Sequence, residues 1–345
     1  MIQWNMSVDR NIGFNTGVRI SYIGSHSVNL GWAQNYNQSP YSTTFYAQQP
    51  LSSRPFPYWG PEVENRDSGG TAFYHSLQAE ANRRFRNGLT FTGAYTLAKN
   101  ITDTGGPNPT SFGGETGNGR VLDAYNRAGN RGDVYGTRRH RFISTAVYEL
   151  PVGRGRAYLN STNRLIDAVA GGWQISSIFL AQSGPYETPY FSGGDPSGTG
   201  SGFYRNQRPD RVANSVPSNQ NRDKWVTRSA FVCPGQSVGP NQYKCSTGIN
   251  PATDLAPIGR FGNSGVGIVQ GPGTVNLSLG MSKAFTIHER LSVRVNGSFT
   301  NVLNHTNLAD PILSLTNANF GKITTAVGTE FGGARTGQVG VRIEF

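Results

Sequence analysis

The sequence predicts an all-β protein whose antiparallel strands cross an outer membrane as part of a β-barrel. Apolar and polar residues alternate in segments of about ten residues, the length at which a tilted strand crosses a bilayer. Short and long connections join these segments in turn, and the last segment ends on an aromatic residue, Phe345. Membrane-spanning helices are excluded because the chain has no run of about 18 consecutive apolar residues.

The composition agrees with a barrel. The mean hydropathy of -0.44 is low for a membrane protein, but alternate residues of barrel strands face a wet interior and long loops face water. The formal net charge is +11, and only five of the 31 basic residues are lysines. The arginines are scattered, which disfavours nucleic-acid binding and suits contact with anionic lipopolysaccharide or anionic ligands.

The first four predicted strands form two hairpins. Residues 2–9 and 14–22 have apolar side chains at every second position and are separated by a short turn. Residues 77–85 and 89–97 alternate in the same way. The pair Asn87-Gly88 lies between them and favours a hairpin, because both residues tolerate positive φ.

The fifth predicted strand, 140–150, is less clearly patterned because Ile143 and Val147 fall on the face opposite its other apolar residues. Strand six begins at Trp173. The remaining strands alternate regularly and are predicted at 275–285, 291–300 and 335–345.

A short amphipathic helix is expected at 161–171, ahead of the sixth strand. Ser161 or Thr162 is the expected N-cap because a hydroxyl can accept a hydrogen bond from the first turn. Gly171 is expected to end the helix.

Residues 1–345 are predicted to form one domain with long loops on one side only. The long, polar connections lie near 33–70, 103–137, 191–270 and 306–334. Bacterial barrels have short periplasmic turns and long outer loops. Each hairpin is therefore expected to turn on the periplasmic side, and each long loop to open outside.

Aromatic residues support this orientation. Barrels carry aromatic girdles at the membrane interfaces, and six aromatic residues fall at strand ends on the predicted periplasmic side: Phe14, Phe85, Tyr148, Trp173, Phe285 and Phe345. Arg83 and Lys283 lie on apolar faces near the same side, where long side chains can reach the interface. A soluble β-sandwich, the alternative fold, would alternate as well but would not show this banding.

Two polar segments have other possible interpretations. Cys233 and Cys245 lie twelve positions apart, so they could form a disulfide in an oxidising compartment or remain free thiols. No histidine stands nearby at the spacing of a zinc site. The glycine-rich run 192–202 is interpreted as a flexible outer loop rather than a phosphate or calcium loop, because it lacks regular acidic spacing.

Several segments resemble the C-terminal barrel of TonB-dependent receptors, most closely the Oar-like acidobacterial group with a carboxypeptidase-regulatory-like N-terminal domain. The resemblance rests on residues 74–100, 138–156, 171–188 and 271–311 and on the closing VRIEF. It implies a barrel of about 22 strands, plugged by an N-terminal domain that the TonB complex rearranges to import a ligand. The terminal strand, with Val341, Ile343 and Phe345, matches the signal read by the barrel assembly machinery.

Nine predicted strands are too few for that barrel, and an odd number would leave the first and last strands parallel. We therefore expect the C-terminal portion of a larger barrel, with neither plug nor TonB box in this chain. The alternative is a complete ten-stranded barrel whose remaining strand is hidden in 33–70 or 191–270.

The expected function is that of an outer-membrane receptor or transporter segment in a Gram-negative bacterium. It would form barrel wall and outer loops for TonB-dependent uptake of a siderophore, oligosaccharide or peptide; the alternative is a passive porin or a surface adhesin. No enzymatic signature such as GxxxxGK[ST], HExxH or GxSxG occurs, and no cofactor is expected. Loop aromatics that could contact a ligand, or pack the loop on itself, are Tyr36, Tyr41, Tyr58 and Trp59.

Overall fold

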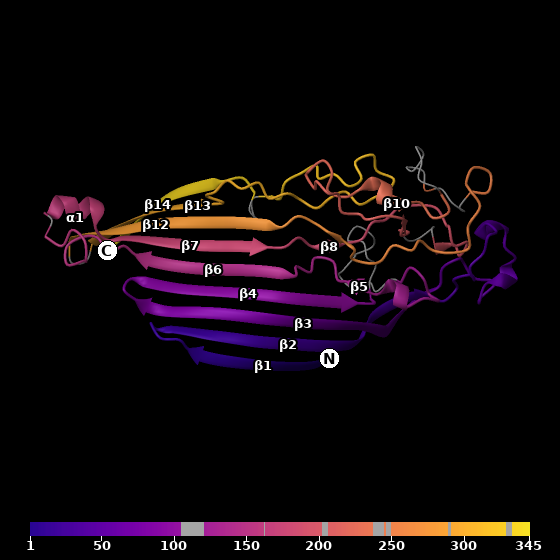
Figure 1. Cartoon of the computed structure of the whole chain (residues 1–345), viewed down its shortest axis with the longest axis horizontal. Coiled ribbons are helices and arrows are strands. Elements are labelled where there is room, and N and C mark those ends of the chain that lie inside the picture. Colours follow the sequence, from indigo (N-terminus) through magenta and orange to yellow (C-terminus); the bar gives the residue numbers. More distant parts are fainter. Residues whose placement is uncertain are drawn as a thin grey trace.

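Nine long strands form one antiparallel sheet in which every strand pairs with its neighbours in the chain (Figure 1). The strands are β1 (Ile2–Asn11), β2 (Thr16–Asn35), β3 (Glu64–Arg86), β4 (Leu89–Thr102), β6 (His140–Glu149), β7 (Trp173–Gln182), β12 (Thr274–His288), β13 (Leu291–Thr300) and β14 (Thr336–Glu344). A two-residue strand, β5 (Gly132–Asp133), pairs with the end of β4. All nine predicted strands are thus confirmed.

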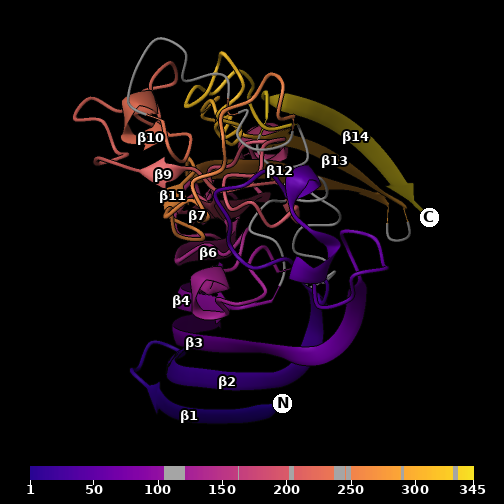
Figure 2. The same cartoon turned by 90° about the vertical axis from the view of Figure 1, so that its right-hand side faces the viewer.

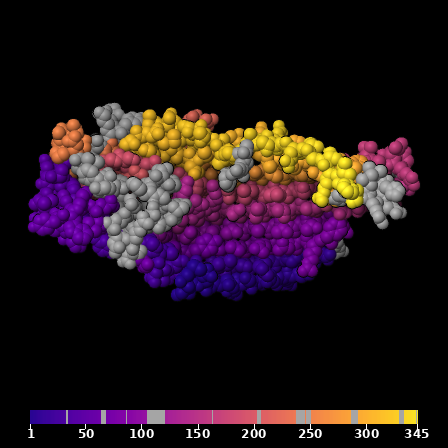
Figure 3. Space-filling model, turned by 180° about the vertical axis from the view of Figure 1, so that it is seen from behind, coloured from indigo at the N-terminus to yellow at the C-terminus, as the bar shows by residue number. Residues whose placement is uncertain are grey.

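This computed structural model describes residues 1–104, 121–161, 163–201, 206–236, 245, 250–288, 291–328 and 333–345. The sheet is a curved wall with β1 and β14 as its outermost strands (Figure 2). Short turns lie at one end of the strands and the long loops at the other (Figure 1). Seen from behind, the strands form parallel bands from indigo to yellow, with most of the loops beyond one end (Figure 3).

The strands on either side of the first long loop are longer than expected. β2 has 20 residues and β3 has 23, and their pairing continues as far as Asn35 and Glu64. The loop therefore spans 36–63, not 33–70. In β2 the alternation is interrupted at Gly24 and His26 before it resumes at Val28, Leu30 and Trp32, and β3 begins with the polar run Glu64–Asp67. These interruptions hid the extensions.

The sheet has one continuous apolar face. Residues directly opposite in an antiparallel pair point to the same side, and Met6, Tyr22, Leu77 and Leu97 form one such row across four strands. All four side chains are exposed. The other two sheets in the described residues have two short strands each, so no second large sheet covers this face as a soluble sandwich would require.

β6 and β7 are apolar on both faces. Ile143 and Val147 lie on the polar side of the sheet, as their sequence positions predict. Leu180 of β7 pairs with Ile143, and Ile178 lies two positions away on the same side. This double-sided character explains why the fifth strand is poorly patterned.

The turns and the helix follow local rules, with one correction. Asn87 and Gly88 adopt φ of 52° and 80°, as a tight hairpin with two positive φ values requires. Helix α1 (Arg164–Ala170) is capped by Asn163, whose side chain accepts from the Ile166 amide. The expected cap at Ser161 is therefore wrong, and Thr162 lies outside the described residues. No described helix has the length and apolar character needed to cross a bilayer.

The buried apolar core lies in the loops. We call the described residues of 36–63, 103–139, 183–273 and 301–335 the loop layer. Its core cluster consists of Phe191, Val226, Ala230, Phe231, Cys233, Cys245, Val269, Leu313, Leu315 and Phe320. Two small sheets frame this cluster, namely β9 (Asp210–Arg211) with β10 (Phe231–Val232), and β8 (Tyr186–Glu187) with β11 (Val269–Gln270).

The glycine-rich run 192–202 is not the flexible loop expected from its composition. Asp195, Ser197 and Thr199 are fully buried. The Asp195 carboxylate accepts hydrogen bonds from the Ser197 hydroxyl and the Gly200 amide. These internal bonds order the segment through residue 201; residue 202 lies outside the described part.

Candidate functional site

The loop layer holds a cavity of about 700 Å³, within the size range of ligand pockets. Three of the four long connections contribute to it. The lining residues are Tyr41 from the first, Asp123, Asn126, Ala128, Gly129 and Arg131 from the second, and Arg208 with Arg260–Gly265 from the third. Residues from distant parts of the sequence therefore share one site.

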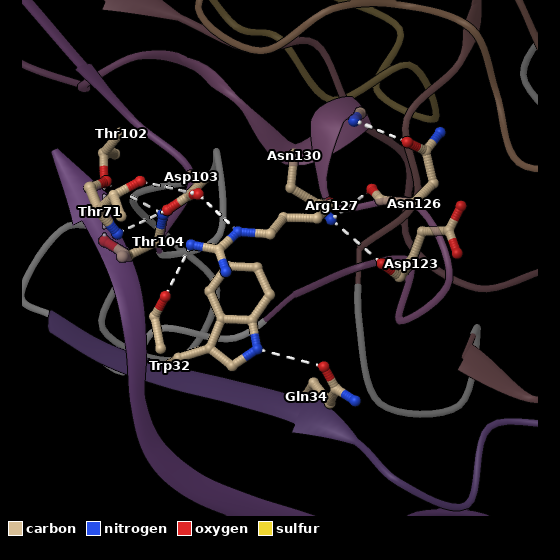
Figure 4. Close-up of polar contacts among 12 residues, drawn as sticks. Trp32, Gln34, Thr71, Thr102, Asp103, Thr104, Asp123, Asn126, Arg127 and Asn130 are labelled. Carbon is tan, nitrogen blue, oxygen red and sulfur yellow. Dashed lines mark hydrogen bonds and ion pairs between the residues drawn. The ribbon is translucent and has the colours of Figure 1, made fainter. Parts of the chain in front are cut away.

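Arg127 fixes the second loop to the ends of the strands (Figure 4). Its Nε donates to Asp103 Oδ2 at 2.8 Å, and its Nη2 donates to the Gly69 carbonyl at 2.6 Å. The guanidinium also lies over the Trp32 ring, 4.6 Å from the centroid. Asp103 in turn accepts from the amide and hydroxyl of Thr71. This network fastens the second loop to the ends of β2, β3 and β4.

The charge on Asp103 is part of this network. Burial alone would raise the pKa of Asp103, but the hydrogen bonds from Arg127 and Thr71 together lower the pKa below its usual value. The carboxylate therefore stays ionised near neutral pH and keeps its attraction for Arg127.

A turn at 126–130 joins the second loop to the third. Asn130 Nδ2 donates to the carbonyls of Asp123 and Asn126, and the Gly129 amide donates to Asn126 Oδ1 (Figure 4). The Gly129 carbonyl accepts from Arg208 Nη1. This side of the cavity is thus built mainly from a hydrogen-bonded backbone turn.

Tyr41 lies opposite this turn and is held by Asp123. Its hydroxyl donates to both carboxylate oxygens of Asp123, at 2.8 and 3.0 Å. Its ring makes edge contacts with Tyr125 and Phe261, with centroids 5.9 and 6.1 Å away. Burial, and then the hydrogen bond to Asp123, raise the pKa of Tyr41, so the hydroxyl remains a donor.

Three guanidinium groups line the cavity, together with the carboxylate of Asp123. Arg208 is 6% exposed, and burial lowers its pKa to about 10, so it is still protonated at neutral pH. Arg260 is neutralised by two bonds of 2.7 Å to Asp210. Arg131 is exposed and lies over the Phe73 ring. Guanidiniums beside aromatic edges are suited to bind a ligand that carries an anionic group and a ring.

Of the predicted ligand-contacting aromatics, the cavity includes Tyr41 alone. Tyr58 is 94% exposed, and Trp59 stacks on Phe56 with centroids 5.4 Å apart. Tyr36 is exposed as well. These three residues are not in the cavity lining, and their contact with a ligand stays a prediction.

No sequence pattern marks Arg131, Arg208 or Arg260 as cavity residues. They are three of many scattered arginines, and only the folding of the second and third loops brings them together. No group of three or more His, Cys, Asp and Glu side chains gathers as a metal site within the part of the chain that the structure describes.

Cys233 and Cys245 form a disulfide within the core cluster of the loop layer, with Cα atoms 5.2 Å apart. At the other end of the molecule, Val341 and Ile343 pair with Val295 and Val293 of β13. Phe345 is fully exposed beyond the end of β14. The recognition of this terminal strand by the assembly machinery stays a prediction.

Comparison with known proteins identifies the family. The sequence matches the family described as outer membrane beta barrel domain over residues 1–338. No curated protein matches it. Among solved structures it is similar to the outer membrane transporter YddB from Escherichia coli, with 8% identity and a TM-score of 0.47. That alignment covers 99% of this chain and 32% of YddB, so the chain spans about a third of that transporter. The chain belongs to the outer membrane beta barrel domain family, and its location is the outer membrane of a Gram-negative bacterium.

Proposed function

We propose that this chain forms part of the barrel wall and of the outer vestibule of a TonB-dependent receptor that imports a bulky or scarce ligand. The observation that carries the proposal is the loop-layer cavity, because three separate loops build it at the end of the strands where an external ligand would arrive. A simple channel would not need a buried loop core, a disulfide and an anchoring network to hold such a cavity in shape.

The sheet supports a place within a larger barrel. It is an open wall of nine long strands, with β1 and β14 at its two sides. We infer that further strands close the barrel, to about 22 in the receptor type that the sequence resembles. In that arrangement a plug domain would fill the barrel and transmit the action of the TonB complex.

The ligand we propose belongs to the siderophore, oligosaccharide or peptide class. Arg131 and Arg208 offer charge-assisted hydrogen bonds, and Tyr41 and Phe261 offer ring edges. This lining favours members of those classes that carry a carboxylate or phosphate group. The partners we propose are the lipid bilayer, lipopolysaccharide and the barrel assembly machinery, and the outer-membrane location supports them.

Uptake by cells that produce the whole receptor tests this function. Accumulation of a labelled anionic siderophore or peptide is expected to require the receptor and to stop when a protonophore removes the energy source. Arg131→Gln is expected to weaken binding about tenfold or more, since a hydrogen bond to a charged group contributes about 1.5–3 kcal/mol. Arg211→Gln, an exposed arginine outside the cavity lining, is the matched control.

Two results would contradict the proposal. Uptake that continues at full rate with the protonophore would indicate a passive porin. Surface attachment of the ligand without any accumulation would indicate an adhesin.

A further inference from the structure

The connection between β6 and β7 presents exposed apolar side chains. On α1, Leu165 and Val169 are 79% and 75% exposed, and Ile166 is exposed beside them. Tyr158 and Leu159, a few residues earlier, are exposed as well. Residues three and four positions apart share one side of a helix, so Leu165, Ile166 and Val169 form a single apolar side.

A lysine of the apolar sheet face binds this helix. Lys283 lies opposite Trp173 in the pairing of β12 with β7, and it is almost fully buried. Its ammonium group donates to the carbonyls of Asp167 and Gly171, at the end of α1. The same group lies 5.6 Å from the centroid of the Trp173 ring and 5.1 Å from that of Phe285. The Asp167 carbonyl also accepts from the Gly171 amide. The ammonium group therefore adds a cation at the C-terminal end of the helix, where the helix dipole favours positive charge.

Trp173 makes a second link between the same two surfaces. Its indole Nε1 donates to the Val169 carbonyl at 2.9 Å. Trp173 lies on the same side of β7 as Ile175 and Phe179, that is, on the apolar face of the sheet. The helix end is therefore attached to the lipid-facing side of the wall, and Figure 1 shows α1 at the end opposite the loop layer.

Basic residues accompany the apolar side chains. Arg154 and Arg164 are exposed in this connection, and Arg156 forms a 3.4 Å pair with the exposed Glu149. The carboxylate of Asp167 accepts from the backbone amide of Arg154, which fixes the preceding turn to the helix. Apolar side chains next to arginines are the pattern of a segment that lies in a membrane interface.

We propose that α1 is an interfacial anchor that inserts Leu165, Ile166 and Val169 into the periplasmic phospholipid leaflet. Arg154 and Arg164 then lie at the level of the lipid phosphates. The occupant of this apolar surface is phospholipid because the helix is fastened to side chains of the face that already meets lipid. The anchor sets the height of the barrel wall in the membrane, and it is independent of what the protein transports.

Lipid-borne quenchers test the proposal in the full chain. The two native cysteines are joined to each other, so a cysteine introduced by Leu165→Cys or Val169→Cys is available for a single fluorescent label. Arg164→Cys is the matched control because Arg164 is exposed on the same helix and lies neither three nor four positions from Leu165, Ile166 or Val169. Vesicles of phosphatidylethanolamine and phosphatidylglycerol would carry brominated acyl chains.

The label at Leu165 or Val169 is expected to be quenched roughly threefold more than the label at position 164, since an interfacial helix buries its apolar side about 5–10 Å deep. Equal quenching at all three positions, with emission as in buffer, would overturn the anchor and leave a protein-facing or water-facing helix. Heat-dependent gel mobility confirms that each labelled variant is folded. Equal quenching in vesicles of phosphatidylcholine alone would overturn the contribution of the arginines.

Discussion

Arg127 and Arg19 make ion pairs of nearly equal length in very different surroundings. The distance is 2.8 Å from Arg127 to Asp103 and 2.7 Å from Arg19 to Asp9. The side chain of Asp103 is 9% exposed, whereas Arg19 and Asp9 are 54% and 60% exposed. Because water screens the exposed pair, the two contacts should contribute unequally to stability.

Arg127→Met is expected to lower the free energy of unfolding of the loop layer by about 1.5–3 kcal/mol, the range for a buried charged hydrogen bond. Arg19→Met is the control and should cost much less, because both partners of its ion pair are exposed to water. Denaturant titration followed by tryptophan fluorescence measures both. The pKa of Asp103 is lowered by folding, so its contribution is present above the ordinary value of 3.8 and is lost as the pH falls below it. Equal costs for the two variants would contradict the role given to burial.

Glu187 and Asp310 are two acidic residues whose pKa values are raised by burial, whereas the pKa of Asp103 is lowered overall. Glu187 is buried in β8. Its carboxyl and that of Asp310 both lie beside Gly271, since a Cβ built on this glycine would be 2.8 Å from Glu187 Oε1 and 3.1 Å from Asp310 Oδ1. Burial, and then the charge of Asp310, raise the pKa of Glu187 to about 9 against an opposing effect of Arg138. The side chain is therefore neutral at neutral pH in the folded protein, although it would be ionised in the unfolded chain.

Glu187→Gln should remove a pH dependence of stability. Because folding raises the pKa of Glu187, its contribution to folding stability is fully present below the ordinary value of 4.5 and is lost as the pH rises toward about 9. The variant should therefore raise the thermal midpoint of the loop layer at about pH 8 and change it little near pH 4.5. Glu149→Gln, at the exposed pair with Arg156, is the control. An equal effect of Glu187→Gln at both pH values would show that Glu187 ionises normally.

Some cavity residues could be predicted from the sequence and others could not. Tyr41 could be selected because an aromatic in a polar loop is unusual, and it does line the cavity. Arg208 could not be selected, since its partner Gly129 lies 79 positions away and neither residue is locally distinctive. Which loop residues meet depends on how the loops pack, and alternation carries no information about that.

Strands and turns were predictable because their rules are local. Alternation located the long strands, least clearly β6 because it is apolar on both faces, and Asn87-Gly88 located a hairpin. The helix cap was wrong by one or two positions because Ser, Thr and Asn are all good caps and the chain offers all three in sequence. The extensions of β2 and β3 were missed since Gly24 and His26 interrupt the alternation of β2 and β3 begins with a polar run.

Gly88→Ala is expected to weaken the hairpin between β3 and β4. Gly88 has φ of 80°, and an added Cβ would lie 2.6 Å from the carbonyl oxygen of Glu149. The positive φ alone costs about 1–2 kcal/mol for a residue with a side chain. Gly17→Ala is the control because nothing lies within 4 Å of its added Cβ. Refolding yield in detergent should fall for the first variant only; similar losses for both would argue against local strain.

The disulfide is expected to stabilise the loop layer without affecting the wall. A Cys233→Ser/Cys245→Ser variant should lose roughly 3 kcal/mol of loop-layer stability, the value for a closed loop of this size. Phe231 and Phe320 lie in the same buried cluster, so limited proteolysis should cut near them in the variant. The strands should stay protected, as in the oxidised parent protein. Unchanged protection of the loop layer would show that its apolar core is sufficient.

The orientation of the whole molecule follows from which face of the sheet meets lipid and which meets water. Opposite residues share a side of the sheet, so Phe179, Leu277 and the remaining apolar positions form a surface that runs from β1 to β14. The family places this protein in an outer membrane, where lipid is the natural partner of such a surface. The polar side then faces the aqueous interior, beneath the loop layer.

Spin labels on both faces test this arrangement in reconstituted vesicles. Labels at Leu277 and Val293 should collide readily with oxygen, which concentrates in the hydrocarbon, and poorly with a water-soluble nickel complex. Labels at Ser278 and Asn296, one and three positions away on the polar side of the same strands, should show the reverse. If all four labels met the nickel complex equally, the sheet would not separate lipid from water. The apolar face would then meet water rather than lipid, and the proposed vestibule would lose its position at the outer surface.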